Sequence, residues 1–186
     1  MRLYKKRARP VSDIRRVLEP GPVILVSSAW KGKQNIMTMG WHMMLADEPT
    51  MVGCYVWTED YSRQMIRKSK ECVINIPTAD MAETVVDIGN STGAEIDKFA
   101  TFGLTAVPAS KVSAPLIGEC YASYECKLVD ESLIRKYSLF VFEVVKAHVA
   151  SSPKYPRTIH YRGQGVFMVS GENTAKYRRR FAPDRL

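Results

Sequence analysis

A small set of polar and aromatic side chains in this sequence has the chemistry to hold a flat ligand that carries negative charge. Asn35 offers both a hydrogen-bond donor and an acceptor, which suits the edge of a heterocycle. Trp41 offers a flat stacking surface. Ser62 and Arg63 stand at the start of a predicted helix, where free N–H groups and a hydroxyl can hold an anion. Lys98, after a glycine-containing loop, adds a positive charge. Each residue taken alone is more often structural than functional.

Several common kinds of active site are missing from the sequence. The three histidines, His42, His148 and His160, are far apart and stand outside any Cys/His cluster, so we expect no metal site. The sequence contains no GxGxxG or GxxxxGK[ST] phosphate loop. The polar and aromatic side chains described above therefore remain as the candidate site.

Length and charge narrow the class of protein. The 186 residues make about one domain. The formal net charge is +8, but residues 1–16 contribute +6 and residues 176–186 contribute +4, so the body carries −2. A nucleic-acid groove would spread its cations over the folded face, so we expect no nucleic-acid binding.

The sequence also indicates the compartment. It has no run of about 18 apolar residues, and no apolar segment follows the basic N-terminus, so we expect neither a membrane helix nor a secretory signal. The four cysteines show no CxxC spacing and are expected to be buried, reduced thiols. These observations favour a cytoplasmic protein that does not bind a membrane.

Strands dominate the predicted elements, and short helices interrupt them. Helices are expected over residues 12–18, 61–69 (capped by Asp60), 79–88 (closed by Gly89) and 95–102. Strands are expected over residues 23–29, 35–41, 50–57, 71–76, 117–129, 139–149, 158–161 and 165–169. Many strands follow one another without a helix between them, which favours an antiparallel barrel with inserted helices over a doubly wound parallel sheet.

The order and spacing of several segments resemble the flavin reductase-like family, most closely its flavoredoxin type. The resemblance rests on residues 35–41 (NIMTMGW), 61–66 (YSRQMI), 72–77 (CVINIP), 91–93 (STG), 97–100 (DKFA) and 139–145 (LFVFEVV). It implies a mainly β, antiparallel, Greek-key-like FMN-binding split barrel over residues 17–170, between a basic lead-in at 1–16 and a basic tail at 171–186. It also implies a homodimer with flavin at the subunit interface.

The resemblance assigns flavin contacts to four of the residues introduced above. Asn35 and Trp41 match a flavin-contacting Asn and Trp of the family, and Lys98 matches a flavin-contacting Lys. Ser62 falls where a hydroxyl residue, often Thr, helps to hold the FMN phosphate.

Four further residues complete the expected cofactor site. Thr38 lies inside the first matched segment, and Tyr137 falls where some members have a His. Phe167 matches an aromatic residue near the ring. Arg63 is added on physical grounds, because a guanidinium can pair with phosphate.

The expected function is an FMN-binding oxidoreductase that moves electrons from NAD(P)H, or from a protein donor, through FMN to flavin or another acceptor. Because the flavin carries the chemistry, we nominate no catalytic acid, base or metal ligand. The sequence lacks a dinucleotide-binding turn, so NAD(P)H would dock over the exposed flavin face. A non-catalytic FMN-binding or electron-carrier protein is the alternative, and a basic nucleic-acid-associated protein is the third reading.

Overall fold

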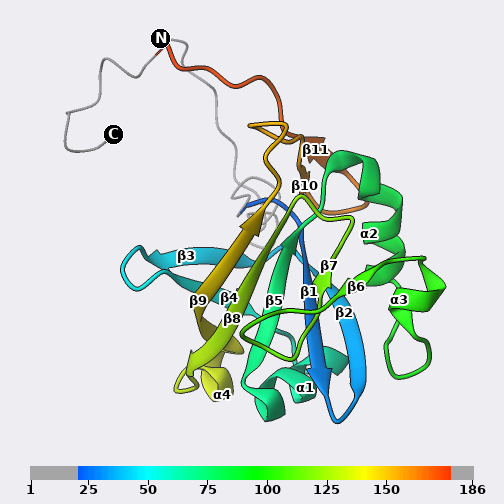
Figure 1. Cartoon of the computed structure of the whole chain (residues 1–186), viewed down its shortest axis with the longest axis vertical. Helices are drawn as coiled ribbons and strands as arrows, with labels where there is room; N and C mark the ends of the chain where they lie inside the picture. Colours follow the sequence, from blue (N-terminus) through cyan, green and yellow to red (C-terminus); the bar gives the residue numbers. More distant parts are fainter. Residues whose placement is uncertain (1–20, 177–186) are drawn as a thin grey trace, which may run out of the picture.

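The computed structural model describes residues 21–176 (Figure 1). The predicted basic lead-in at 1–16, the helix at 12–18 and the last ten residues of the basic tail lie outside the described residues. Within the described part, seven strands form one antiparallel sheet in the order β2-β1-β5-β8-β9-β4-β3. Their bounds are β1 (Ile24–Trp30), β2 (Lys33–Met39), β3 (His42–Ala46), β4 (Met51–Tyr55), β5 (Glu71–Ile76), β8 (Ala122–Asp130) and β9 (Leu139–Val149).

Shorter elements complete the described fold and confirm the prediction of a mainly β protein with inserted helices. Two small antiparallel sheets pair β6 (Ala106–Val107) with β7 (Leu116–Ile117) and β10 (Ile159–Tyr161) with β11 (Phe167–Val169). The helices are α1 (Tyr61–Ser69), α2 (Ala82–Gly89) after a 3₁₀ turn at Ala79–Met81, α3 (Lys98–Thr101) and α4 (Ile134–Tyr137). None of the helices in the described range is long and apolar enough to cross a membrane.

The turn between β1 and β2 sets the position of Asn35. Lys31 and Gly32 both have positive φ, 50° and 76°, as a two-residue type I′ hairpin turn requires. The strands then pair from Trp30 with Lys33 onward, which places Asn35 opposite Ser28.

Alternation along the strands divides the apolar residues between two cores. Ile24 and Val26 of β1 face one way and Val23 and Leu25 the other, as the two-residue period of a strand dictates. The inner core joins six strands with α1 and α4, and its buried members are Ile24, Val26, Met37, Met39, Val52, Cys54, Val56, Ile66, Cys72, Ile74, Cys126, Ile134, Phe140 and Phe142.

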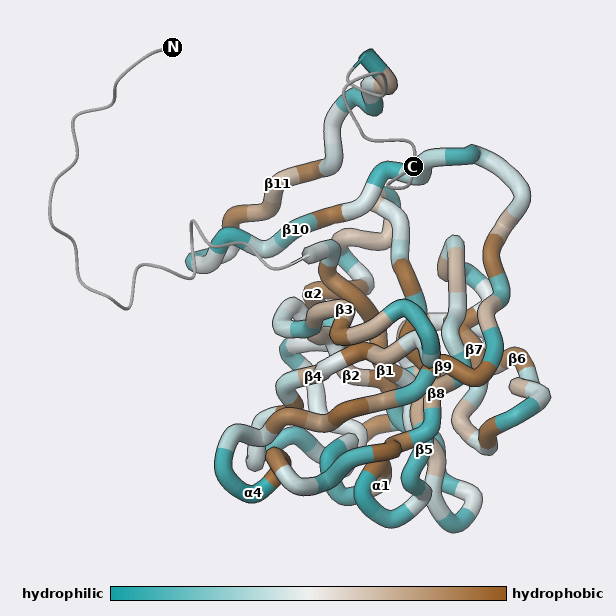
Figure 2. The backbone as a smooth tube through the Cα atoms, turned by 90° about the vertical axis from the view of Figure 1, so that its left-hand side faces the viewer, coloured by the Kyte–Doolittle hydropathy of each residue, from teal (hydrophilic) through white to brown (hydrophobic). Residues whose placement is uncertain are grey.

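Helices α2 and α3 lie on the β2 side of the sheet in Figure 1, and their buried side chains pack on the opposite face of β1 and β2. Val85 and Ile88 of α2 and Phe99 of α3 pack there with Leu25 and Ile36. In Figure 2 hydrophobic segments run along the sheet strands, and the β10–β11 hairpin stands away from the sheet. The helices therefore bring the α2–α3 connection to the edge strand β2.

All four cysteines carry free thiols, and three of them, Cys54, Cys72 and Cys126, lie in the inner core. Cys72 and Cys126 pair directly across β5 and β8. Burial raises the pKa of the Cys54 and Cys72 thiols well above the ordinary value, and the neighbouring Cys126 raises it further. The Cys54 and Cys72 thiols are therefore neutral packing groups at physiological pH.

Several predicted boundaries were wrong. The segment predicted as a strand at 35–41 ends at Met39, and a separate strand, β3, begins at His42 after Gly40 and Trp41. The helix expected at 95–102 is shortened to α3, and β6 and α4 were not predicted. Gly89 is the last residue of α2 rather than a left-handed cap, since Asn90 follows it as C-cap with φ −84°.

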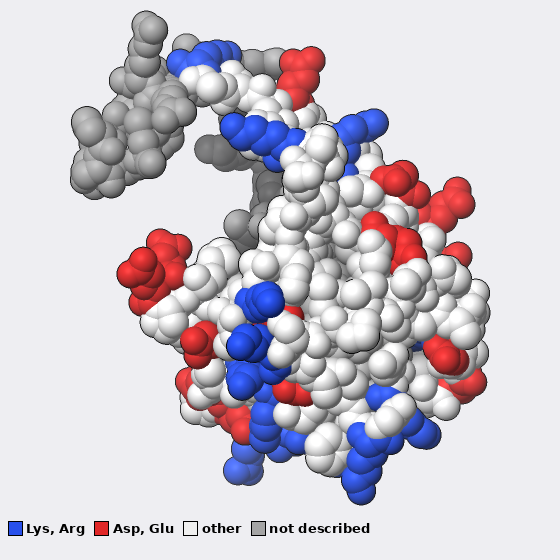
Figure 3. All heavy atoms as spheres, in the orientation of Figure 1, with Lys and Arg blue, Asp and Glu red and all other residues white. Residues whose placement is uncertain are grey.

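Charged side chains of both signs are exposed on the face drawn in Figure 3, where lysines and arginines form separate groups rather than one continuous stripe. One carboxylate is instead fully buried. Glu125 on β8 accepts hydrogen bonds from the Ser110 N–H and hydroxyl and from the Lys111 N–H, and it contacts His148 Nε2 at 2.7 Å. Burial alone would raise the pKa of Glu125, but these hydrogen bonds lower it to about 2. Glu125 thus holds the 110–111 loop against the sheet.

We predict that Glu125→Gln lowers the free energy of unfolding by about 2–3 kcal/mol at pH 7, because several charge-assisted hydrogen bonds are lost. The folded-state pKa lies below the ordinary value, so this stabilisation is present above about pH 4.5 and is lost as the pH falls towards 2. Urea unfolding of both proteins at pH 7 and pH 3 measures it. Glu119→Gln, which removes an exposed carboxylate that binds the Thr105 N–H, is the control. A wild-type advantage that is equal at both pH values would contradict the prediction.

Candidate functional site

A polar cavity of about 130 Å³ lies where β2, the start of α1 and the α2–α3 connection meet. It contains four of the eight residues predicted from the sequence: Asn35, Thr38, Ser62 and Lys98. The remaining lining residues are Met37, Glu59, Asp60, Tyr61, Ile88, Gly89, Ser91, Thr92 and Gly93.

Asn35 is buried and only partly satisfied. Its Nδ2 donates to the Ser62 hydroxyl at 2.9 Å, and the Ser28 hydroxyl donates to Ser62 at 3.3 Å. Its Oδ1 is the buried side-chain oxygen without a hydrogen-bond partner within residues 21–176. Because an unpaired buried acceptor is costly, this oxygen is suited to receive an N–H or O–H group of a ligand.

The loop at 91–93 approaches Asn35 closely. A Cβ atom at Gly93 would lie 2.0 Å from Asn35 Oδ1, so any larger residue would displace the amide. On the other side of the strand, Thr38 donates its hydroxyl to the Val85 carbonyl at 2.7 Å and packs near Gly89. Glycine therefore permits the α2–α3 segment to close over β2.

Lys98 brings a cation into the polar cavity. Its side chain is almost fully buried, and Nζ donates to the Ile88 carbonyl at 2.8 Å. Burial lowers the pKa of Lys98 to about 8, and the charge of Asp60 opposes that shift. The position is fixed because Asp97, the preceding residue, caps α3 by accepting from the Ala100 N–H at 3.2 Å.

Asp60 occupies the predicted cap position of α1 but does not cap it through its side chain. Its backbone is extended, and its Oδ2 accepts from the Trp57 N–H at 2.9 Å instead of from the helix. Burial raises the pKa of Asp60, while the Trp57 hydrogen bond and the cations Lys98 and Arg63 lower it.

An aromatic groove of about 470 Å³ adjoins the polar cavity and shares Met37, Thr38 and Asp60 with it. Trp41 and Trp57 line this groove with about half of each side chain exposed, 52% and 56%. The Trp41 ring lies 5.2 Å from the Tyr55 ring. The remaining lining residues are Met39 and Gly40.

Three predicted site residues lie elsewhere. The Arg63 guanidinium donates to the Val56 and Ile134 carbonyls and lies over the Phe140 ring, so it braces α1 rather than lining the polar cavity. Tyr137 is exposed on α4.

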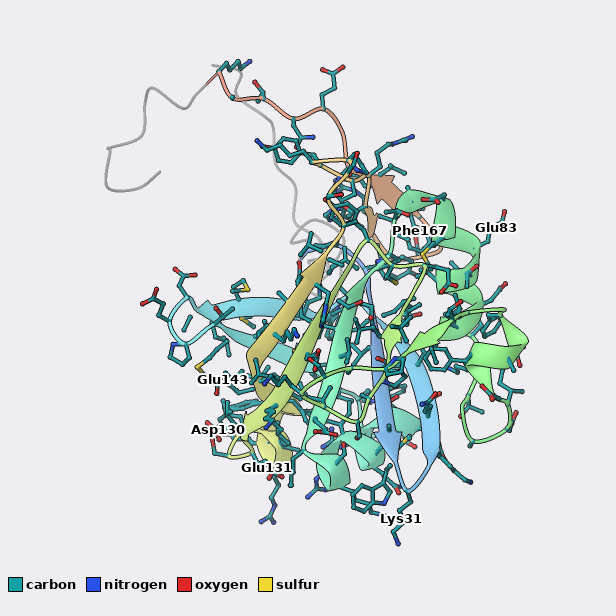
Figure 4. All side chains as sticks on the ribbon, in the orientation of Figure 1. Lys31, Glu83, Asp130, Glu131, Glu143 and Phe167 are labelled. Carbon is teal, nitrogen blue, oxygen red and sulfur yellow. The ribbon has the colours of Figure 1, made fainter. Side chains whose placement is uncertain are left out.

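Phe167 lies in β11 beside α2 (Figure 4), where it packs on Tyr161 at 5.1 Å. Like Arg63 and Tyr137, it lines neither the polar cavity nor the aromatic groove. The flavin contacts expected of Tyr137 and Phe167 therefore stay predictions.

Sequence reasoning missed Trp57, Asp60 and Gly93 as site residues. In the structure Trp57 and Asp60 stand in the loop between β4 and α1, and binding residues often occur in such loops, but the predicted strand at 50–57 includes Trp57 at its end. Gly93 lies in one of the segments that carry the family resemblance.

The residues present fit a flavin. A flavin has a flat apolar ring, polar edges with an N–H group, ribityl hydroxyls and a phosphate. The aromatic groove suits the ring, the unpartnered oxygen of Asn35 suits an N–H or O–H donor, and Lys98 suits a negatively charged group.

Comparison with known proteins agrees with this fit. The model of the flavin reductase like domain family matches residues 15–167. A protein of Archaeoglobus fulgidus is 33% identical over 113 residues, which are 61% of this chain and 64% of that protein. The chain thus matches just under two thirds of that relative's length.

Two solved structures have a similar fold. The FMN-binding domain of a flavin reductases-like enzyme from Shewanella baltica is 26% identical, with a TM-score of 0.76 over 90% of this chain and 95% of that one. Flavoredoxin of Desulfovibrio vulgaris (Miyazaki F) is 25% identical, with a TM-score of 0.77 over 84% of this chain and 90% of that one. The expected split-barrel fold is confirmed, and the chain belongs to the flavin reductase-like family.

Proposed function

We propose that this protein is an FMN-dependent oxidoreductase that takes electrons from NAD(P)H, or from a protein donor, and passes them through bound FMN to flavin or another acceptor. The observation that carries the proposal is that the polar cavity adjoins the aromatic groove. Within the described residues the polar cavity has an Asn35 oxygen without a hydrogen-bond partner, and the aromatic groove has two half-exposed tryptophans.

In this proposal the chain's own residues bind and orient the cofactor. Asn35 accepts a hydrogen bond from the flavin, and Ser62 holds the Asn35 amide in place rather than contacting the phosphate itself, because its hydroxyl is buried against Asn35 and Ser28. Lys98 meets a negatively charged part of the cofactor, and Trp41 contributes the flat surface. Bound FMN supplies the hydride and electron transfer.

The open groove is where we place the electron donor. The groove is lined by exposed aromatic side chains, and the sequence has no dinucleotide-binding turn. NAD(P)H, which the cytoplasm supplies, would therefore dock over the cofactor with few contacts to its adenosine half. We expect weak binding of the donor and modest discrimination between NADH and NADPH.

We also propose that the protein works as a homodimer. The β3–β4 hairpin exposes Met43, Met44 and Leu45, with 54%, 60% and 43% of each side chain accessible. β3 is also an edge strand of the sheet, so its outer edge is unpaired within the described residues. A second copy of the chain would cover these apolar side chains and the aromatic groove next to them.

The visible spectrum of the purified protein tests the proposed function. We expect a flavin spectrum, release of FMN on denaturation and bleaching on anaerobic mixing with NADH or NADPH. Steady-state rates with both donors should differ by much less than a thousandfold. If dithionite bleaches the flavin while neither nicotinamide does, the protein is an electron carrier or a non-catalytic FMN-binding protein.

We predict that Gly93→Ala weakens FMN binding about tenfold or more. The added methyl group would overlap Asn35 Oδ1, so the amide must move and its hydrogen bond to the flavin is lost. Titration of the apoprotein by flavin fluorescence measures the change. Gly171→Ala is the control, because a Cβ atom there meets nothing within 4 Å. Equal FMN affinities for Gly93→Ala and wild type would remove Asn35 from the site.

The oligomeric state is expected to depend on the β3–β4 hairpin. Light scattering at micromolar concentration should give twice the mass of the chain for the wild type. Met44→Glu should give a monomer or weaken association at least tenfold, because it places a charge in an apolar interface. Val129→Glu, at another exposed apolar position, should stay dimeric. A monomeric wild type would refute the proposed dimer.

A further inference from the structure

Asp60 and Lys98 face the same polar cavity from different elements. Asp60 stands just before α1, and Lys98 is the first residue of α3. Asp60 also lines the aromatic groove, so it stands where the two hollows join. Its carboxylate is held in place by the Trp57 N–H at 2.9 Å. A negative charge is thus fixed at the entrance to a cavity that also contains a buried cation.

The Lys98 ammonium is poorly compensated by hydrogen bonds. An ammonium group has three N–H donors, and within the described residues Nζ is bonded to one acceptor, the Ile88 carbonyl. Only 4% of the residue is exposed, so the polar cavity is where the other two donors can meet an acceptor. A buried charge of this kind is costly unless an opposite charge lies near it. A carboxylate near Lys98 would therefore favour its protonated form.

Among the residues that the structure describes, Asp60 and Lys98 form no direct salt bridge, but both line the polar cavity, so the carboxylate can act on the ammonium across it. Burial lowers the pKa of Lys98 to about 8, and the charge of Asp60 raises it against that effect. The effect is mutual, because Lys98 and Arg63 both lower the pKa of Asp60, which burial raises. Asp97 adjoins Lys98 in the chain, but unlike Asp60 it does not line the polar cavity, and its carboxylate accepts from the Ala100 N–H.

The other walls of the cavity add little charge. β2 and the 91–93 loop contribute uncharged side chains, and the segment before and at the start of α1 adds two titratable groups besides Asp60, namely Glu59 and Tyr61. Glu59 lines the same cavity as Asp60 and carries the same charge, which makes it a matched control.

We propose that Asp60 is a positioning residue of this site: its carboxylate keeps Lys98 in the charged form and so sets the pH range over which the cavity attracts the negatively charged part of a bound flavin. The flavin half of this statement rests on the proposed function, whereas the pairing of Asp60 with Lys98 does not. Lys98 carries its charge below about pH 8 and loses it as the pH rises through that value. Without Asp60 the loss occurs at lower pH.

The pairing is tested on the apoprotein by NMR. In protein labelled with ¹³C-lysine, the Cε signal of Lys98 is assigned by its absence from Lys98→Arg, and its shift is followed from pH 6 to pH 11. Asp60→Asn should lower the pKa of Lys98 by about one unit or more, as removal of a nearby opposite charge does. Asn keeps an oxygen to accept from the Trp57 N–H, so the loop is retained.

Two further variants separate charge from structure. Asp60→Glu restores the carboxylate and should return the Lys98 titration to within about 0.3 units of wild type, whereas a merely structural role of Asp60 would not be rescued by charge. Glu59→Gln should leave the titration within the same margin. An unchanged pKa in Asp60→Asn, or an equal fall in Glu59→Gln, overturns the proposal.

FMN binding as a function of pH tests whether Asp60 affects flavin binding through Lys98. The pH at which the wild-type apoprotein loses half of its FMN affinity should fall in Asp60→Asn by as much as the Lys98 pKa falls. Riboflavin, titrated in parallel, shows whether the phosphate is the negatively charged part: an equal pH dependence for riboflavin assigns the charge to the ring edge. If FMN affinity depends on pH in the same way in Asp60→Asn and in the wild type, the proposed effect of Asp60 on flavin binding is overturned. Absence of FMN binding in every variant, with the NMR shift present, refutes the proposed function and leaves the pairing standing.

Discussion

The register of the β1–β2 hairpin is the constraint on which the site depends. Lys31 and Gly32 form a two-residue turn that fixes which residues of β2 face each core. A slip by one residue would turn Ile36 towards the inner core and carry Asn35 to the helix-covered face, away from Ser62. The sheet register therefore places Asn35, and the helices add the other side chains of the site.

Two buried charged side chains, Glu125 and Lys98, show how burial can serve stability in one place and binding in another. Glu125 is fully buried, yet N–H groups, a hydroxyl and an imidazole surround it, so its charge is satisfied within the chain. Lys98 is nearly as buried, but one carbonyl accepts from it and the rest of its bonding capacity is directed at a cavity. The incomplete bonding of Lys98, like the unpartnered oxygen of Asn35, marks a place where the folded chain leaves room for a ligand.

Much of the fold could be predicted from local patterns, because α1, β5 and β9 have bounds set by clear amphipathic or alternating segments. The break between β2 and β3 was missed because residues 36–45 are mostly apolar, with polar Thr38 and His42 too few to mark a boundary at Gly40. Four of the eight proposed site residues meet in the polar cavity, and Trp41 lies in the adjoining groove. The direction of the Arg63 side chain could not be predicted, because it depends on the Val56 and Ile134 carbonyls, which only the tertiary structure brings to it, and its phosphate contact stays a prediction.

The three thiols of the inner core can be used to measure how often the barrel opens. Cys54 and Cys72 are fully shielded and, with their raised pKa values, hold almost no thiolate at neutral pH. An alkylating reagent can reach them only when the strands around them separate, and so the rate of labelling counts opening events of the core. Since these cysteines come from β4, β5 and β8, their relative labelling rates distinguish strands that open together from strands that fray alone.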